Sequence, residues 1–182
     1  MLFLRRFLKD EKLESAAAAV YAVAAQQARH PAFYLSYEVP DTVDGRFEMV
    51  VLQAYILFRR LKGQGEAIDR LTQATYDVMF RELDLALREM GAADLGVGRR
   101  IKHMAESMNG RIQFYDQGLV ADDGDASLGA ALRRNLYGTV SPSEDSLARM
   151  VRYLKVAIAA LEDQQIDRIA AADFHFPDPN TI

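Results

Sequence analysis

The chain contains no cysteine among its 182 residues. That absence excludes disulfide frameworks, thiol catalysis, cysteine-based zinc sites and iron–sulfur clusters. It agrees with a reducing compartment, and we expect a cytoplasmic protein. Long apolar runs are missing too, because the most apolar stretch, residues 47–58, is much shorter than the ~20 residues that cross a bilayer. Glu48 and Gln53 interrupt this stretch, which predicts a buried helix in a globular core.

Residues from which active sites are commonly built are also scarce. The three histidines, His30, His103 and His175, lie far apart in the sequence and none has a second histidine at helical spacing. The glycine pairs at 63–65 and 96–98 lack the lysine of a phosphate loop and the third glycine of a dinucleotide site. No serine lies in a nucleophile elbow. We therefore expect no catalytic residue, no metal and no cofactor.

Acidic residues outnumber basic ones, 26 against 22, and the formal net charge is −4. The excess lies after Leu161, where five acidic residues accompany one arginine. A mildly acidic chain lacks the broad basic face that meets phosphates, which argues against nucleic acid as a specific ligand. Whether the acidic end folds back over the basic residues near 94–111 depends on the tertiary structure.

Helical periodicity dominates the chain and predicts an all-α fold with a single compact domain of about six to eight helices. The expected helical segments are residues 13–27, 47–58, 66–90, 94–120 and 127–137, and a last one that starts near 141. Asn109 and Gly110 form a turn signal that predicts an interruption of the fourth segment. Ser141, Pro142 and Glu144 have the pattern of a capping box at the start of the last.

Prolines mark two segments that we expect to be irregular. Pro31 and Pro40 bound an aromatic stretch, which predicts an extended connector near residues 31–41. Residues 174–182 contain two further prolines and few helix formers, which predicts a loose C-terminal tail.

The first ten residues, MLFLRRFLKD, are basic and amphipathic. In a helix, Leu4, Phe7 and Leu8 would share one side and the basic residues would cover the others. Such an arm can bind an anionic membrane surface, or it can pack its apolar side against the domain. The order of charged and apolar residues does not fit a secretory signal.

A dense cluster of basic residues and methionines occupies residues 94–111, DLGVGRRIKHMAESMNGR. Its cations are Arg99, Arg100, Lys102 and Arg111. Met104 and Met108 are four residues apart, so they share one helix face, and methionine adapts to varied apolar partners. Core methionines beneath a solvated basic face explain the same spacing.

A second cluster, VPDTVDGRFEMVVLQAY, covers residues 39–55. Pro40-Asp41 and Asp44-Gly45 are turn-forming pairs that lead into the buried helix. Arg46 follows in the first turn, where a cation opposes the helix dipole. We therefore expect an acidic partner for Arg46, either within the fold or on another protein.

These clusters resemble the ubiquinol–cytochrome c chaperone family, the assembly factors for cytochrome b of the respiratory bc1 complex. The matching stretches are VPDTVDGRFEMVVLQAYILFRRL, FRELDLALREMG and DLGVGRRIKHMAESMNGRIQFYD. The combination is fairly specific and covers most of residues 39–116, and the rest of the chain is more generic. Early acidic residues, Asp10, Glu11 and Glu14, do not fit a mitochondrial presequence, so the chain resembles a compact bacterial relative.

The resemblance implies an all-helical, non-enzymatic chaperone that binds newly made cytochrome b or another membrane-protein client. It further implies a small helical partner subunit and peripheral contact with the inner membrane, at its inner face, or with the ribosome. The residues it suggests for partner binding, together with the two methionines, are Asp41, Asp44, Gly45, Arg46, Glu89, Asp94, Gly98, Arg99, Lys102, Met104, Met108, Gly110, Arg111 and Tyr115. Some of these residues must be structural. From another class of function, a helical domain that binds a lipid, a quinone or haem remains open.

Overall fold

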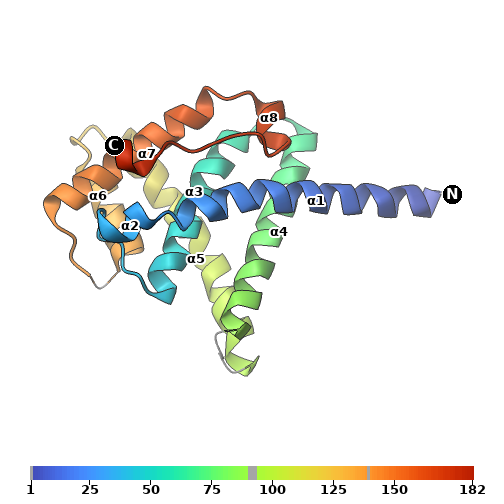
Figure 1. Cartoon of the computed structure of the whole chain (residues 1–182), viewed down its shortest axis with the longest axis horizontal. Helices are drawn as coiled ribbons and strands as arrows, with labels where there is room; N and C mark the ends of the chain where they lie inside the picture. Colours follow the sequence, from blue (N-terminus) through green and yellow to red (C-terminus); the bar gives the residue numbers. More distant parts are fainter. Residues whose placement is uncertain (1, 90–93, 139) are drawn as a thin grey trace.

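The computed structural model describes the backbone of residues 2–89, 94–138 and 140–182, and the side chains from residue 11 onward except 87, 90–105 and 139. All regular elements in these ranges are helices, which confirms the all-α fold (Figure 1). They are α1 (Leu2–Ala28), α2 (Pro31–Leu35), α3 (Val43–Leu61), α4 (Glu66–Glu89), α5 (Asp94–Val120), α6 (Ala126–Leu132), the π-helix η1 (Arg133–Tyr137), α7 (Glu144–Glu162), α8 (Ile166–Ala170) and the 3₁₀ turn η2 (Pro179–Thr181).

Helix α3 forms the centre of the fold, as its apolar sequence predicts. It packs against α1, α4, α7 and η1. Residues 47–57 of α3 are all buried, including Glu48 and Gln53. A helix that is apolar on nearly every side gains hydrophobic free energy only when neighbours surround it. The remaining helices are therefore arranged around α3 (Figure 1).

The first half of the expected extended connector is instead a short helix, α2. Its start is set by His30, whose Nδ1 accepts a hydrogen bond from the backbone N–H of Ala32 at 3.2 Å. Pro31 follows at the first helical position, where its missing N–H is not needed. Residues 36–42 then continue without a helix to α3. The N-terminal part of α1 projects beyond the other helices in Figure 1.

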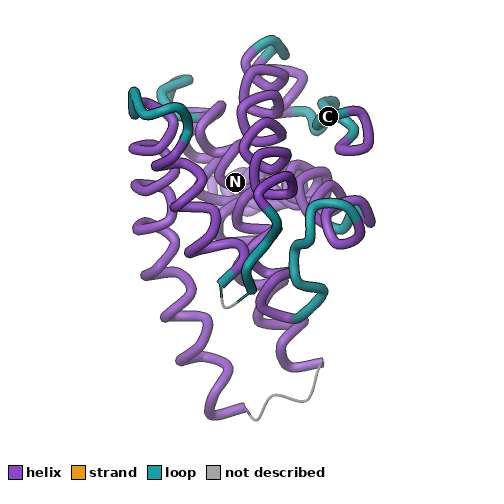
Figure 2. Tube along the Cα trace, turned by 90° about the vertical axis from the view of Figure 1, so that its left-hand side faces the viewer, coloured by secondary structure: helices purple, strands orange, loops and turns teal. Residues whose placement is uncertain are grey.

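Helices α4 and α5 form a hairpin that reaches away from the rest of the molecule in both views (Figures 1 and 2). The expected interruption at Asn109 and Gly110 is wrong, because α5 is continuous through both residues. One glycine inside a helix costs only ~1 kcal/mol. Buried neighbours on the same helix, Met108 and Tyr115, offset that cost by packing into the core.

The cap of α7 lies two residues later than the capping-box pattern predicts. Ser143, not Ser141, accepts a hydrogen bond through its Oγ from the N–H of Ser146 at 3.2 Å. The Glu38 carboxylate favours Ser143 as the cap, since it accepts a hydrogen bond from the N–H of Ser143 at 2.7 Å. Glu144 turns away and pairs with Arg133.

The expected loose tail is also wrong, because the C-terminal residues pack against the body. Phe174, Phe176 and Pro179 are buried. The Tyr37 hydroxyl donates to the carbonyl of Pro179 at 2.7 Å, and contacts join η2 to α2 and α8 to α1. The acidic end therefore packs against α1 and α2. Its prolines oppose an α-helix but leave the neighbouring apolar side chains free to pack.

Candidate partner-binding groove

A groove of about 680 Å³ lies between α1, α3 and α4, which we call the α1–α3–α4 groove. Helix α1 contributes small side chains, Ala18, Ala22 and Ala25, and α3 contributes Val43, Phe47 and Val50. The α4 wall contains Val78, Leu83, Leu85 and Ala86. Leu85 is 48% exposed, an unusual position for a large apolar side chain. The groove can therefore hold an apolar segment of another molecule.

Two of the residues singled out from the sequence, Arg46 and Glu89, line this groove, with Arg29 and Glu82 as further charged members. Arg46 comes from the start of α3 and Glu89 from the end of α4, so the fold brings together residues 43 positions apart in the chain. Charged groups beside apolar walls can recognise the polar ends of a bound apolar segment.

The acidic partner of Arg46 lies within the fold. The Nε atom of Arg46 donates to Oδ1 of Asp41 at 2.6 Å, although both side chains are more than half exposed. This hydrogen bond lowers the pKa of Asp41 and raises that of Arg46. The guanidinium also lies 5.8 Å from the centre of the Tyr34 ring. Arg46 thus lines the groove with Asp41 as its ion-pair partner.

Gly45 has a structural reason to be glycine. A Cβ atom at this position would lie 2.0 Å from the carbonyl oxygen of Pro40. The N–H of Gly45 meanwhile donates to Oγ1 of Thr42, which caps α3, at 3.1 Å. The turn that delivers Asp41 and Arg46 therefore packs directly on the first turn of α3. Asp44 is exposed beside it.

Arg111 forms a buried ion pair rather than an open contact surface. Its Nε donates to Oε2 of Glu48 at 2.8 Å, and a second nitrogen contacts Oε1 of the same carboxylate. The exposed fractions are only 17% for Arg111 and 11% for Glu48. Burial raises the pKa of Glu48, and this outweighs the opposite effect of Arg111. The pair links α5 to α3.

Met108 and Tyr115, two further predicted binding residues, lie in the core. Met108 is 0% and Tyr115 1% exposed, and the Tyr115 ring lies 5.2 Å from that of Tyr55. Burial raises the pKa of the Tyr115 hydroxyl. In this conformation neither side chain is exposed to a partner. Met108 is a core methionine, which is the alternative that the sequence spacing left open.

The remaining predicted residues divide into two groups. Gly110 is partly buried in α5, and a Cβ there would meet no atom of the described chain within 4 Å, so neither a turn nor a close helix contact explains it. Asp94, Gly98, Arg99, Lys102 and Met104 lie in α5, but their side chains fall outside the described residues.

Sequence reasoning missed two features of this region. In the sequence, Glu48 was interpreted only as an interruption of an apolar run. A carboxylate inside a buried helix requires a cationic partner, and that requirement was the signal for the pair with Arg111. The alanines of α1 indicate a helix, but their spacing at 18, 22 and 25 also places a line of small side chains along one wall of the groove.

Within the described ranges, no helix is both long and apolar enough to cross a membrane. The same part of the chain contains no group of three or more His, Asp or Glu side chains that could hold a metal ion.

Comparison with known proteins agrees with the resemblance noted in the sequence. The sequence profile described as "Ubiquinol-cytochrome C chaperone" matches residues 35–176, most of the chain. The chain belongs to the ubiquinol-cytochrome c chaperone family. The match includes α3, α4 and α5, and thus most of the groove. Members similar to this chain carry names that describe them as assembly factors of ubiquinol-cytochrome c reductase.

Among curated proteins, the Xenopus laevis ubiquinol-cytochrome-c reductase complex assembly factor 1 is 24% identical over 151 residues, which cover 83% of this chain and 74% of that protein. Mitochondrial protein CBP3 of Saccharomyces cerevisiae is 28% identical over 81% of this chain. The chain spans 44% of the yeast protein and half of the human and mouse relatives.

A solved structure, the Cbp3 homolog from Brucella abortus, is similar over almost the full length. The TM-score is 0.82 at 31% identity, and the alignment covers 99% of both chains. This similarity extends to the parts outside the sequence clusters, including the packed C-terminal residues, and it agrees with the expectation of a compact bacterial relative.

Proposed function

We propose that this protein is a non-enzymatic assembly chaperone that binds newly made cytochrome b during biogenesis of the bc1 complex. Membership of the family and the names of its relatives support a role in assembling ubiquinol-cytochrome c reductase. The single observation that carries the client proposal is the α1–α3–α4 groove, whose apolar walls are bordered by Arg46 and Glu89.

In this proposal the groove holds one apolar segment of the client while the charged residues contact its polar flanks. Covering such a segment removes apolar surface from water and lowers its tendency to aggregate. The small side chains of α1 allow the client backbone to approach closely, and the exposed Leu85 adds apolar contact area. A client held this way needs no catalytic group.

The experiment is capture of cytochrome b, synthesised in a cell-free system with detergent, by the tagged full-length chain. Ala86→Glu places a carboxylate in the groove from an exposed position on α4. We expect about tenfold weaker capture, because burying the new charge against an apolar segment is costly. Ala67→Glu is the matched control, since Ala67 is exposed on the same helix outside the groove.

Equal capture by both variants, with circular dichroism showing both folded, would remove the groove from the proposal. Failure of the unmodified chain to capture cytochrome b would remove the client itself. A double variant, Arg99→Ala with Lys102→Ala, tests the basic cluster separately. It omits Arg111, whose loss would disturb the buried pair with Glu48.

The proposed cellular position is the cytoplasmic side, with peripheral contact to the inner membrane or the ribosome and with a small helical partner subunit. Flotation of the full chain with anionic vesicles tests the membrane contact. A chain shortened by residues 1–10 should float less if the basic N-terminal arm binds lipid.

A second candidate function is the binding of a small apolar molecule such as a lipid, a quinone or haem. It is favoured by a hollow of about 840 Å³ between α3, α4 and α5, lined by Tyr55, Phe58 and Tyr76 among others. Titration of the purified chain with haem or a short-chain quinone, followed by tyrosine fluorescence, tests it. Absence of saturable binding would exclude these ligands.

A further inference from the structure

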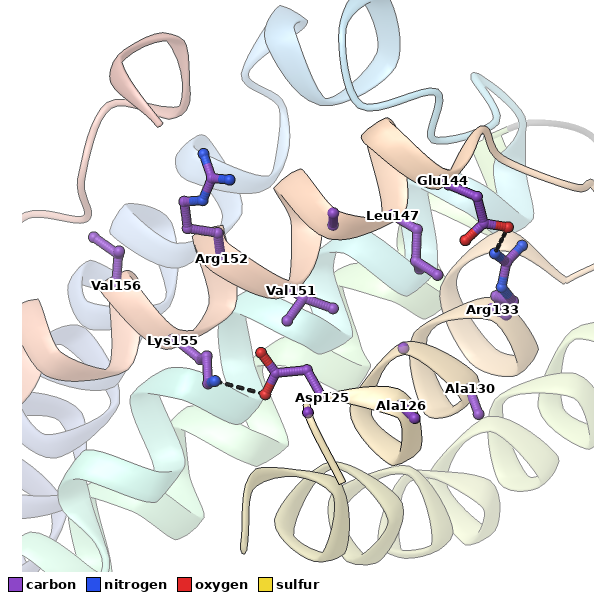
Figure 3. Close-up of a pocket in the computed structure, with 13 residues that line it drawn as sticks. Asp125, Ala126, Ala130, Arg133, Glu144, Leu147, Val151, Arg152, Lys155 and Val156 are labelled. Atoms are coloured by element: carbon purple, nitrogen blue, oxygen red, sulfur yellow. Dashed lines mark hydrogen bonds and ion pairs between the residues drawn. The ribbon is translucent and has the colours of Figure 1, made fainter. Parts of the chain in front are cut away.

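A second groove, of about 650 Å³, lies between α6 and α7 and shares no lining residue with the α1–α3–α4 groove. Its floor is apolar and contains small residues. Leu147 and Val151 are directed from α7 toward α6, where Ala126 and Ala130 lie (Figure 3). Gly129 packs under Leu147, and a Cβ there would lie 3.4 Å from Leu147 Cδ2. Such a floor lets another helix approach closely.

An ion pair lies at each end of this groove. Lys155 Nζ lies 2.5 Å from Oδ1 of Asp125, and Arg133 lies 2.6 Å from Oε1 of Glu144 (Figure 3). Each pair joins α7 to the segment that carries α6.

The α7 lip of the groove carries positive charge that the described chain does not neutralise. Arg152 lines the groove and is exposed, and it has no carboxylate partner in the described ranges.

We propose that the α6–α7 groove docks an amphipathic helix of another protein, with an apolar face of small and aliphatic residues flanked by carboxylates. The apolar floor receives the face of the helix, and Arg152 pairs with its acidic flank. A helix satisfies its own backbone hydrogen bonds, so it can cover this floor without leaving polar groups unpaired. The docking site is separate from the groove proposed for the client.

The test uses two synthetic helical peptides that share one alanine- and leucine-rich face, flanked by glutamate in one and by lysine in the other. Fluorescence anisotropy measures their binding to the full-length chain. We expect the glutamate peptide to bind about tenfold more tightly, with an affinity that falls as salt is added. Equal binding of the two peptides would overturn the proposal.

Variants of α7 give the matched comparison. Ala148→Glu places a carboxylate in the groove four residues before Arg152, where it would pair with that arginine and occupy the floor. Ala159→Glu adds the same charge at an exposed position of α7 outside the groove. We expect about tenfold weaker peptide binding for Ala148→Glu and none of this loss for Ala159→Glu.

Arg152→Ala keeps the test decisive if Ala148→Glu does not fold, because it removes only an exposed side chain; unchanged binding by this variant would overturn the proposal. Light scattering tests whether a second copy of this chain occupies the groove instead. If the chain dimerises and Ala148→Glu makes it monomeric, a second copy covers the groove and the acidic partner helix is excluded. Cytochrome b capture is measured in parallel, so failure here is distinguishable from failure of the client proposal.

Discussion

Gly45 and Gly110 both belong to the segments that resemble the family, yet their surroundings differ. Gly45 lies against the carbonyl of Pro40 and has no room for a side chain. Gly110 lies inside α5 with open space where its Cβ would be. Packing among the described residues therefore accounts for the first glycine and not for the second.

Substituting each glycine by alanine should change stability in opposite directions. Gly45→Ala should lower the free energy of unfolding by about 1–3 kcal/mol, because the turn must move to admit the methyl group. Gly110→Ala should raise it by about 0.5–1 kcal/mol, because alanine is the better helix former. Urea unfolding followed by circular dichroism measures both. A destabilised Gly110→Ala protein would show that α5 needs glycine for its own packing.

Gly110→Ala also separates folding from binding. If this variant is more stable but captures cytochrome b less well, the open space at Gly110 is used by a partner. Unchanged capture would assign no binding role to Gly110.

Arg111→Leu should leave Glu48 buried without its cation and cost about 3–5 kcal/mol at neutral pH. Burial already raises the pKa of Glu48 in the intact protein. The stability that depends on its protonated form is therefore present below the ordinary glutamate pKa and lost as the pH rises through the raised value. Removing Arg111 raises this pKa further, so the difference between variant and parent should widen with increasing pH.

Urea midpoints at about pH 4 and about pH 7 measure this effect. Arg168→Leu is the control, because Arg168 pairs with Asp173 in full exposure and its loss should change the midpoint little at either pH. A constant difference for Arg111→Leu across this range would mean that Glu48 stays in one protonation state.

At the scale of elements, the C-terminal segment after α8 acts as a strap on α1 and α2. Phe174 and Phe176 are buried with ring centres 5.9 Å apart, whereas His175 between them is exposed. The Gln27 side chain donates to the carbonyl of Pro177 at 3.0 Å, and the Gln164 side chain holds both the N–H and the carbonyl of His175. The strap thus combines apolar burial with satisfied backbone groups.

Phe176→Ala should therefore destabilise the whole fold by about 3 kcal/mol, since it leaves a cavity in the hydrophobic core. His175→Ala should leave the unfolding midpoint unchanged, because its backbone contacts remain. Denaturant unfolding of the two variants measures the difference. Equal midpoints would mean that the segment contributes nothing to the stability of the body.

At the scale of the whole molecule, the two grooves lie on different sets of helices and can be occupied independently. Ala86→Glu should weaken capture of cytochrome b and leave binding of the glutamate peptide intact, and Ala148→Glu should do the reverse. A chain with both substitutions should bind each ligand as weakly as the corresponding single variant does, because distant sites without shared partners are energetically independent. If either variant weakens both ligands, the grooves form one site or are coupled through the core.

Local pattern was sufficient for the long helices and for the buried position of α3, but not for the short helix α2. Apolar residues recur every three or four positions in residues 47–58, and such a repeat reports on one helix without reference to the others. The motifs of residues 39–61 and 94–116 were sufficient to identify the family. The turn signal at Asn109 and Gly110 failed because tertiary contacts of Met108 and Tyr115 override a local preference.

Contacts between distant parts of the chain were decided only by packing. Arg111 meets Glu48 across 63 residues, and no local pattern states which carboxylate a buried arginine will meet. The C-terminal prolines agree with the absence of an α-helix there, but the burial of Phe174 and Phe176 depends on a core formed by distant parts of the chain. Both grooves arise in the same way, because their walls come from helices that the chain brings together only when it folds.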